Sequence, residues 1–229
     1  MKETAFNMQE FVSIVSHDFR APIRHLCQFS NILSESLSTP TEEQEQCVEF
    51  IKNSTEQCNK MMDALTQLSQ VHTQAIHAVP TDFDALLRLT CAELAVRDHC
   101  QPILNITNSV AERPSMDAWH AKTLVQALTD NAFKFRNQNK DLVLQLDISN
   151  DNGQQVIKIS DNGIGISPHF IDHCTIIFKQ LDTSVEGVGL GLTLVENIVF
   201  LYQGSLTVES EIDGSQGGTT VTIVLPLKR

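Results

Sequence analysis

Apolar residues recur at regular spacing along the first third of the chain. Steps of four and three alternate from residue 8 to residue 33, and Phe11, Ile14 and Ile32 widen the resulting stripe. The stripe consists of Met8, Val12, Val15, Phe19, Pro22 with Ile23, Leu26, Phe29 and Leu33. This heptad spacing predicts a helix with one apolar face. A second segment repeats it with Val48, Ile51, Thr55, Cys58, Met62 and Leu65, so a helical hairpin is predicted over roughly residues 3–75.

The connection "SLSTPTEEQ" carries the signals of a helix start. Thr39 is predicted to cap the second helix, with Pro40 in its first turn and Glu42 completing a capping box. Two helices alone cannot bury two wide apolar faces. Pairing two hairpins into a four-helix bundle would bury them, so we expect a homodimer.

The pattern changes after residue 77, where we expect the first domain (1–77) to end and a second (78–229) to begin. The second domain mixes helical and strand patterns, which predicts an α+β sandwich with one sheet and helices on one face. Expected helices are 83–98, 115–136 (opened by Ser115 and Asp117) and 190–204 (ended by Gly204). Expected strands are 102–108, 141–149, 154–160, 205–210 and 217–227, with the hairpin signal "NDNG" joining the second and third.

Charge and cysteine usage narrow the class of protein. A net charge of −12 argues against a nucleic-acid-binding surface but is compatible with a small nucleotide ligand. The six cysteines form no CxxC pair, and no apolar run approaches a membrane span. We therefore expect a cytoplasmic location. The helical pattern opens abruptly, which also fits the cytoplasmic part of a longer, membrane-bound receptor with its sensor domain upstream.

The stretch "SHDFRAPIRHL" places a histidine beside an aspartate and a proline. Asp18 can hold one imidazole nitrogen of His17 and accept its proton, which leaves the other nitrogen as a nucleophile. Pro22 cannot donate to the carbonyl of Asp18, so the helix is loosened beside His17. An ordinary solvated histidine is the alternative. A zinc site is disfavoured because no second ligand lies at helical spacing from His17.

Two further stretches carry groups suited to a nucleotide. In "LTDNAFKF", Asn131 and Lys134 share a helix face, and their amide and ammonium suit Mg²⁺ and phosphate. In "SDNGIGI", Asp161 follows a strand and could accept from an adenine amino group, while Gly163 and Gly165 allow close backbone approach. Taken singly, each stretch is also compatible with a solvated helix face or a turn.

A third stretch, "EGVGLGLTLVENI", is rich in glycine. Gly187, Gly189 and Gly191 lead into a helix, so their backbone N–H groups could cradle an anion. The stretch lacks the lysine of a Walker loop and the preceding strand of a dinucleotide fingerprint. A flexible loop is the alternative.

In their order along the chain, these motifs resemble those of the sensor histidine kinases of two-component signalling. "SHDFRAPIRHL" resembles the phosphoacceptor box, and "DNAFKF", preceded by Asp117, resembles the asparagine box. "DNGIGI" and "GVGLGL" resemble the two glycine boxes, and "IFKQL" with Phe178 resembles the phenylalanine box between them. "GGTTVTIVLP" resembles the last strand of the ATP domain, so the resemblance spans nearly the whole chain.

The resemblance implies a GHKL-type ATPase domain after a dimeric four-helix bundle, with ATP and Mg²⁺ as cofactors. His17 would accept the γ-phosphoryl group, Asp18 would act as general base, and Asn131 would ligate Mg²⁺. The phosphoryl group would then pass to an aspartate on the receiver domain of a response regulator. The implied ATP-binding set is Asn131, Lys134, Phe135, Asp161, Gly163, Gly165, Phe178, Gly187, Gly189, Leu190, Gly191 and Thr219.

Three features depart from the family pattern. Ala127 replaces an asparagine that often precedes Asn131 by four residues. Ala21 replaces the Thr or Asn with which many relatives orient water, so we expect weak phosphatase activity toward the regulator. Eight residues separate Phe178 from Gly187, which predicts a short lid. A catalytically weak ATP-binding dimeric module and another ATPase of the same fold stay open as alternatives.

Overall fold

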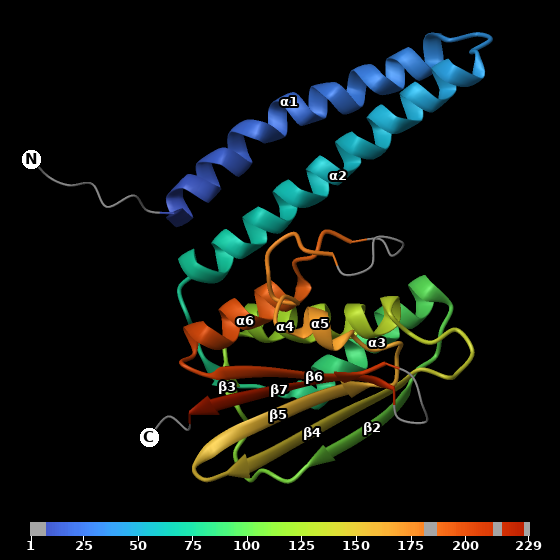
Figure 1. The fold of residues 1–229 in the computed structure, drawn as a ribbon. Coiled ribbons are helices and arrows are strands. Elements are labelled where there is room, and N and C mark those ends of the chain that lie inside the picture. Colours follow the sequence, from blue (N-terminus) through green and yellow to red (C-terminus); the bar gives the residue numbers. More distant parts are fainter. Residues whose placement is uncertain (1–7, 181–186, 213–216, 227–229) are drawn as a thin grey trace, which may run out of the picture. The chain divides into compact units, whose positions relative to one another are not determined.

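The computed structural model describes residues 8–180, 187–212 and 217–226, with side chains from residue 19 onward (Figure 1). The chain divides into two compact units between Gln74 and Ala75, three residues before the boundary that the sequence pattern predicts. Within the described ranges, none of the helices combines the length and apolarity that a membrane crossing requires.

The first unit is a helical hairpin. Helix α1 (Met8–Ser36) runs through Pro22 without interruption, and α2 (Glu42–Thr73) packs along it. Helix α2 begins with a capping box in which Thr41 Oγ1 accepts from the N–H of Gln44, and Gln44 Oε1 accepts from the N–H of Thr41. The predicted cap at Thr39 with Glu42 is therefore wrong by two residues. The connection contains two overlapping capping patterns, and Pro40 precedes the cap instead of following it.

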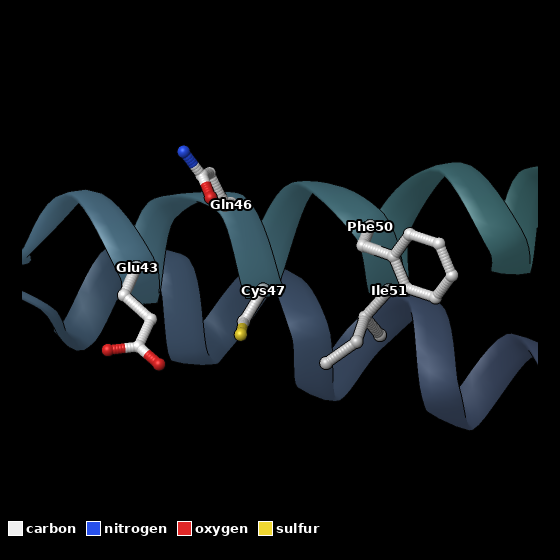
Figure 2. Close-up of a pocket in the computed structure, with 5 residues that line it drawn as sticks. All are labelled: Glu43, Gln46, Cys47, Phe50 and Ile51. Carbon is white, nitrogen blue, oxygen red and sulfur yellow. The ribbon is translucent and has the colours of Figure 1, made fainter.

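The two helices contact each other along a face that shares only Ile23 with the heptad stripe of α1 among the described stripe residues Phe19 to Leu33. Ile23 and Ser30 are buried on α1, opposite a buried row on α2 that includes Val48 and Thr55. The stripe residues Phe19, Leu26, Phe29 and Leu33 are all exposed. A shallow pocket on α2 adds exposed apolar surface and is lined by Glu43, Gln46, Cys47, Phe50 and Ile51 (Figure 2). The hairpin alone thus leaves wide apolar faces uncovered.

The second unit is built on one mixed sheet. Its described strands are β2 (Ile103–Asn108), β4 (Val143–Asp151), β5 (Gln154–Asp161), β6 (Ser205–Glu211) and β7 (Gly218–Pro226), in the order β2-β4-β5-β7-β6. The β2–β4 pair is parallel and the other pairs are antiparallel. Helices α3 (Phe83–Asp98), α4 (Ala118–Lys134) and α6 (Gly191–Leu201) cover one face, as the sequence predicts (Figure 1).

The core lies between this sheet and its helices. Alternate strand residues such as Leu144, Leu146 and Ile157 are fully buried, as are Leu124 on α4 and Ile198 on α6. The period of two in the strands and the apolar helix faces therefore account for the packing. The predicted "NDNG" hairpin joins β4 to β5 through two residues with positive φ, which suits the twist of the strands.

The ends of two helices differ from the sequence-based expectation. Ser115 lies in β3 (Ser115–Met116), which pairs with β1 (Val79–Pro80), so it does not open α4. Helix α6 ends at Leu201 in a Schellman motif whose left-handed residue is Gln203. Gly204 is still required, because a Cβ atom there would lie 2.5 Å from the carbonyl oxygen of Val224.

Asp117 caps α4 and links three segments. Its Oδ1 accepts hydrogen bonds from the N–H groups of Trp119 and His120, and its Oδ2 accepts from the N–H of His77. Its own N–H donates to Tyr202 Oη, which lies 3.0 Å from Nδ1 of buried His120. Burial opposes ionisation of Asp117, but these backbone hydrogen bonds and the His120 charge hold its pKa below the ordinary value.

Candidate active site

Asp161 lies at the carboxyl end of β5 and is held by backbone groups. Its Oδ1 accepts hydrogen bonds from the N–H groups of Gly163, at 2.8 Å, and Thr219, at 3.3 Å. Among the described residues, its Oδ2 has no hydrogen-bond partner. Burial raises the pKa of this carboxyl, although the two backbone bonds act in the opposite direction. A fixed and partly desolvated acceptor of this kind can bind a donor group of a ligand.

The loop after Asp161 packs so closely that only glycine fits. A Cβ atom at Gly163 would lie 2.4 Å from the carbonyl oxygen of Phe135, which also accepts a hydrogen bond from the N–H of Ile164. Gly165 has φ of +73°, and a Cβ atom there would lie 2.0 Å from the carbonyl oxygen of Glu211. Phe135 thus holds this loop through its backbone at the end of α4.

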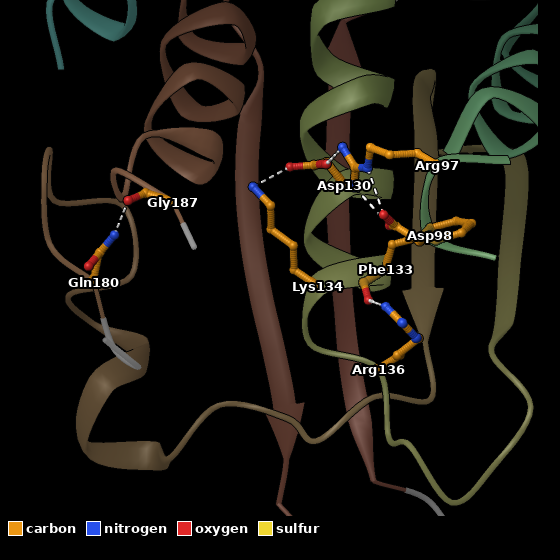
Figure 3. Close-up of polar contacts among 8 residues, drawn as sticks. All are labelled: Arg97, Asp98, Asp130, Phe133, Lys134, Arg136, Gln180 and Gly187. Atoms are coloured by element: carbon orange, nitrogen blue, oxygen red, sulfur yellow. Dashed lines mark hydrogen bonds and ion pairs between the residues drawn. The ribbon is translucent and has the colours of Figure 1, made fainter. Parts of the chain in front are cut away.

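Helix α4 brings Asn131 and Lys134 to the start of α6. A Cβ atom at Gly191, the first residue of α6, would lie 3.2 Å from Nδ2 and 3.3 Å from Oδ1 of Asn131. The Asn131 amide has no partner among the described residues. Lys134 Nζ would lie 4.0 Å from a Cβ atom at Gly187, and it forms an ion pair with Asp130 at 2.5 Å (Figure 3). An amide, an ammonium and a helix N-terminus therefore meet in one place.

The glycine-rich segment before α6 is held by contacts with Phe178, Lys179 and Gln180. The N–H of Phe178 donates to the carbonyl oxygen of Gly189, whose missing side chain leaves room for the backbone of Lys179. Gln180 donates through Nε2 to the carbonyl oxygen of Gly187 (Figure 3). Leu190 is buried immediately before α6. The predicted short lid includes residues 181–186, which lie outside the described residues.

The backbone of α1 includes His17 and Asp18, and the side chains of both lie outside the described part. Ala21 and Pro22 are exposed on the same helix. Sequence reasoning missed Asp130 and Ser210, which bind predicted site residues directly. The register of β6 against β7 would have pointed to Ser210, because Ser210 is the cross-strand partner of Thr219.

Two family models match the chain. The model described as "His Kinase A (phospho-acceptor) domain" matches residues 7–74, and the "Histidine kinase-, DNA gyrase B-, and HSP90-like ATPase" model matches residues 116–229. The first covers the helical hairpin and the second covers most of the sheet unit, including every candidate nucleotide-site residue described above.

Two curated proteins match nearly the whole chain. Cyanobacterial phytochrome A of Nostoc sp. is 25% identical over 223 residues, which cover 96% of this chain and 28% of that protein. Sensor protein RprX of Bacteroides fragilis is 26% identical over 227 residues, which cover 95% of this chain and 43% of that protein. The chain therefore spans less than half of either relative.

Among solved structures, full-length ShkA in complex with AMPPNP has a TM-score of 0.65 at 21% identity, over 95% of this chain and 45% of that one. This likeness confirms the predicted fold, a helical hairpin followed by an α+β sandwich. The two family models and the sensor-protein relative give the chain its family. The chain belongs to the sensor histidine kinases and carries the phosphoacceptor domain followed by the ATPase domain of that family.

Proposed function

We propose that the chain is the catalytic core of an ATP-dependent protein histidine kinase that phosphorylates its own His17. The main support is the gathering of groups from three separate motifs in the second unit. The Asp161 carboxylate lies among glycine backbone at one end, and Asn131 and Lys134 meet the N-terminus of α6 at the other. The phosphoacceptor-domain match disfavours the alternative of an unrelated ATPase with this fold.

At the base end, Asp161 Oδ2 would accept a hydrogen bond from the adenine amino group. The close-packed backbone at Gly163 and Gly165 would let the ring approach the loop. Thr219 would lie beside this end, because its N–H donates to the same carboxyl group. These contacts would orient the nucleotide without taking part in bond breaking.

At the phosphate end, Lys134 and the backbone N–H groups at the start of α6 would bind the phosphates. The amide oxygen of Asn131 fits Mg²⁺, which commonly takes few protein ligands and completes its shell with phosphate oxygens and water. No cluster of three His, Cys, Asp or Glu suited to a metal occurs in the described part of the chain, so Asn131 would be the main protein ligand. When bound, Mg²⁺ would neutralise phosphate charge.

The transfer step would use His17 as nucleophile. Asp18 would accept the proton from one imidazole nitrogen while the other nitrogen attacks the γ-phosphorus. The bond from phosphorus to nitrogen forms as the bond from phosphorus to the β,γ-bridging oxygen breaks, and ADP leaves. The protein would contribute mainly positioning and charge stabilisation, as is usual in phosphoryl transfer.

We further propose that the chain acts as a homodimer and passes the phosphoryl group to an aspartate of a response-regulator receiver domain. The exposed apolar stripe on α1 supports the dimer, because a second hairpin could cover it in a four-helix bundle. The chain spans only part of its relatives, so we place the sensor domain elsewhere in the full protein, and we expect the catalytic core to lie in the cytoplasm.

The decisive experiment is incubation of the purified chain with Mg²⁺ and γ-labelled ATP. We expect an acid-labile, base-stable label that His17→Ala abolishes. The matched control is His25→Ala, which removes an exposed histidine eight residues further along α1 and should retain the label. A label that persists in His17→Ala would refute the proposal.

A second candidate function is a nucleotide-binding dimeric module without kinase activity. Ala127 favours it, because an alanine on α4 cannot assist Asn131, four residues later, in binding Mg²⁺. The same experiment distinguishes the two functions. Nucleotide binding by the wild-type chain without any label would support the module and reject the kinase.

A further inference from the structure

Ser210, near the end of β6, forms hydrogen bonds with the segments that lie around Asp161. Its Oγ accepts a hydrogen bond from the N–H of Ile166 at 2.8 Å, in the glycine loop that follows Asp161. It donates to the carbonyl oxygen of Gly218 at 2.7 Å and lies 2.9 Å from Oγ1 of Thr219. One half-buried hydroxyl thus joins the glycine loop, β6 and the start of β7.

The geometry also fixes the direction of the bond between the two hydroxyls. A serine hydroxyl has one proton and two acceptor positions. The proton of Ser210 goes to the carbonyl oxygen of Gly218, and one acceptor position takes the N–H of Ile166. In the contact with Thr219, Ser210 must therefore be the acceptor and Thr219 the donor. Because its proton is used in this contact, the Thr219 hydroxyl can bind a further partner only as an acceptor, through its lone pairs.

Close backbone contacts hold this arrangement in place. Gly218 lies against the end of β5, where a Cβ atom would come 1.9 Å from the carbonyl oxygen of Asp161. The N–H of Thr219 donates to Asp161 Oδ1, so Thr219 and Asp161 border the same space. Two oxygen atoms with acceptor capacity, Oδ2 of Asp161 and Oγ1 of Thr219, therefore belong to residues that a direct hydrogen bond holds together.

We propose that Ser210 is a specificity-determining residue that orients the Thr219 hydroxyl and makes the site select 6-aminopurine over 6-oxopurine nucleotides. The inference rests on the proposed function, in which the base lies at Asp161. The two N–H donors of a 6-amino group match two acceptors, directly or through one water. A 6-oxo group is itself an acceptor and is left without a donor. A site built in this way discriminates strongly, because a mismatched base leaves buried polar groups unpaired.

The test compares the affinities of the intact chain for ATP and inosine triphosphate, which differ at this purine edge. In Ser210→Ala, the freed Thr219 hydroxyl can turn and donate to a 6-oxo group. We expect the ratio of ATP to inosine triphosphate affinity to fall about tenfold, the scale of one hydrogen bond. Ser210→Thr keeps the hydroxyl and should retain the ratio. Ser205→Ala, at the exposed start of the same strand, is the matched control.

A purely structural role for Ser210 would weaken both nucleotides equally and leave the ratio unchanged, and that result would overturn the inference. Thr219→Val gives an independent check if Ser210→Ala fails to fold. It should lower the ratio by itself, and adding Ser210→Ala should lower it no further. An unchanged ratio in Thr219→Val would also overturn the inference. A wild-type chain that binds no ATP, or an Asp161→Asn variant that binds it normally, would instead refute the proposed nucleotide site.

Discussion

The ammonium nitrogen of Lys134 lies 2.5 Å from Oδ2 of Asp130, one helical turn earlier on α4. The same carboxylate is held from the other side, because its Oδ1 accepts from Nη1 of Arg97 at 2.9 Å (Figure 3). The cation that we propose for the ATP phosphates is therefore paired with a fixed anion in the free protein. Bound phosphates must compete with Asp130 for Lys134.

Asp130→Asn should tighten ATP binding, because it removes the competing negative charge beside the phosphates. The pair is partly exposed, so we expect a change of about threefold in the dissociation constant, in line with the modest strength of such pairs. Calorimetric titration with ATP, ADP and adenosine checks this. The gain should grow with the number of phosphates and vanish for adenosine.

The matched control is Asp151→Asn. It makes the same charge change in an exposed residue at the opposite end of the β4–β5 hairpin from Asp161. This variant should bind all three ligands as the wild type does. Equal tightening in both variants would show that net charge, and not the contact with Lys134, is responsible.

Asp161→Asn should stabilise the nucleotide-free chain at neutral pH while abolishing ATP binding. Because the folded-state pKa of Asp161 is raised, the folded chain holds its proton to higher pH than the unfolded chain does. Stability is therefore lost as pH rises from the unfolded value of about 4 through the folded value, and the cost persists at neutral pH. Asparagine cannot ionise and avoids this cost.

Thermal unfolding of wild type and Asp161→Asn at two pH values tests this linkage. We expect Asp161→Asn to unfold at a higher temperature than the wild type at neutral pH, and this gain to be much smaller at about pH 4. A gain that is the same at both pH values would show that ionisation of Asp161 is not the cause. Asp151→Asn, exposed and distant, should show neither effect.

Much of the fold follows from local patterns in the sequence. The helix over 83–98 and the "NDNG" hairpin are found as predicted. The cap and turn residues that define them act on backbone groups only a few positions away, so the sequence pattern reveals them. The two-residue strands β1 and β3 were missed, since a pair of residues carries no period. The pair of Asp130 with Lys134 was missed although its i,i+4 spacing on a helix is a local signal. The contacts of Arg97 with Asp130 and of Ser210 with Thr219 could not be predicted locally, because they depend on tertiary packing and strand register.

The N-cap of α2 is Thr41 in the structure, whereas the sequence pattern predicts Thr39, and substitutions can test the two positions directly. Thr41→Ala removes the observed cap of Gln44 and should cost about 1 kcal/mol of stability. Thr39→Ala, which the sequence pattern favours as the cap, should change stability by less than about 0.5 kcal/mol, as exposed substitutions usually do. Chemical unfolding of the two variants in parallel measures both. A larger loss in Thr39→Ala would contradict the observed cap.

Ala21 predicts that the chain removes phosphoryl groups slowly from a response regulator. The residue is exposed on α1, four positions after His17, and its methyl group cannot orient a water. Ala21→Asn should raise the rate of regulator dephosphorylation several-fold while His17 still accepts label. The assay uses a receiver domain that the wild-type chain has first been shown to phosphorylate. Rapid dephosphorylation by the wild type would contradict the prediction.

The apolar stripe on α1 predicts the effect of a charge at the dimer interface. Phe29 is 66% exposed in the isolated chain although it is one of the apolar positions of the heptad pattern. Phe200 on α6 is 75% exposed and lies in the other unit. The two residues are chemically identical and similarly exposed, so the same substitution at each separates the interface from general surface effects.

Phe29→Glu should weaken dimerisation strongly, because in a two-fold symmetric dimer the substitution removes the Phe29 side chain of both copies from the interface. Burying one Phe contributes roughly 1.5–3 kcal/mol, so two copies predict a rise in the dimer dissociation constant of at least about a hundredfold. Sedimentation or light scattering over a range of concentrations measures this, and Phe200→Glu should leave the dimer intact. If the Phe29→Glu chain stays dimeric at wild-type concentrations, the heptad stripe is not the surface that pairs the two hairpins.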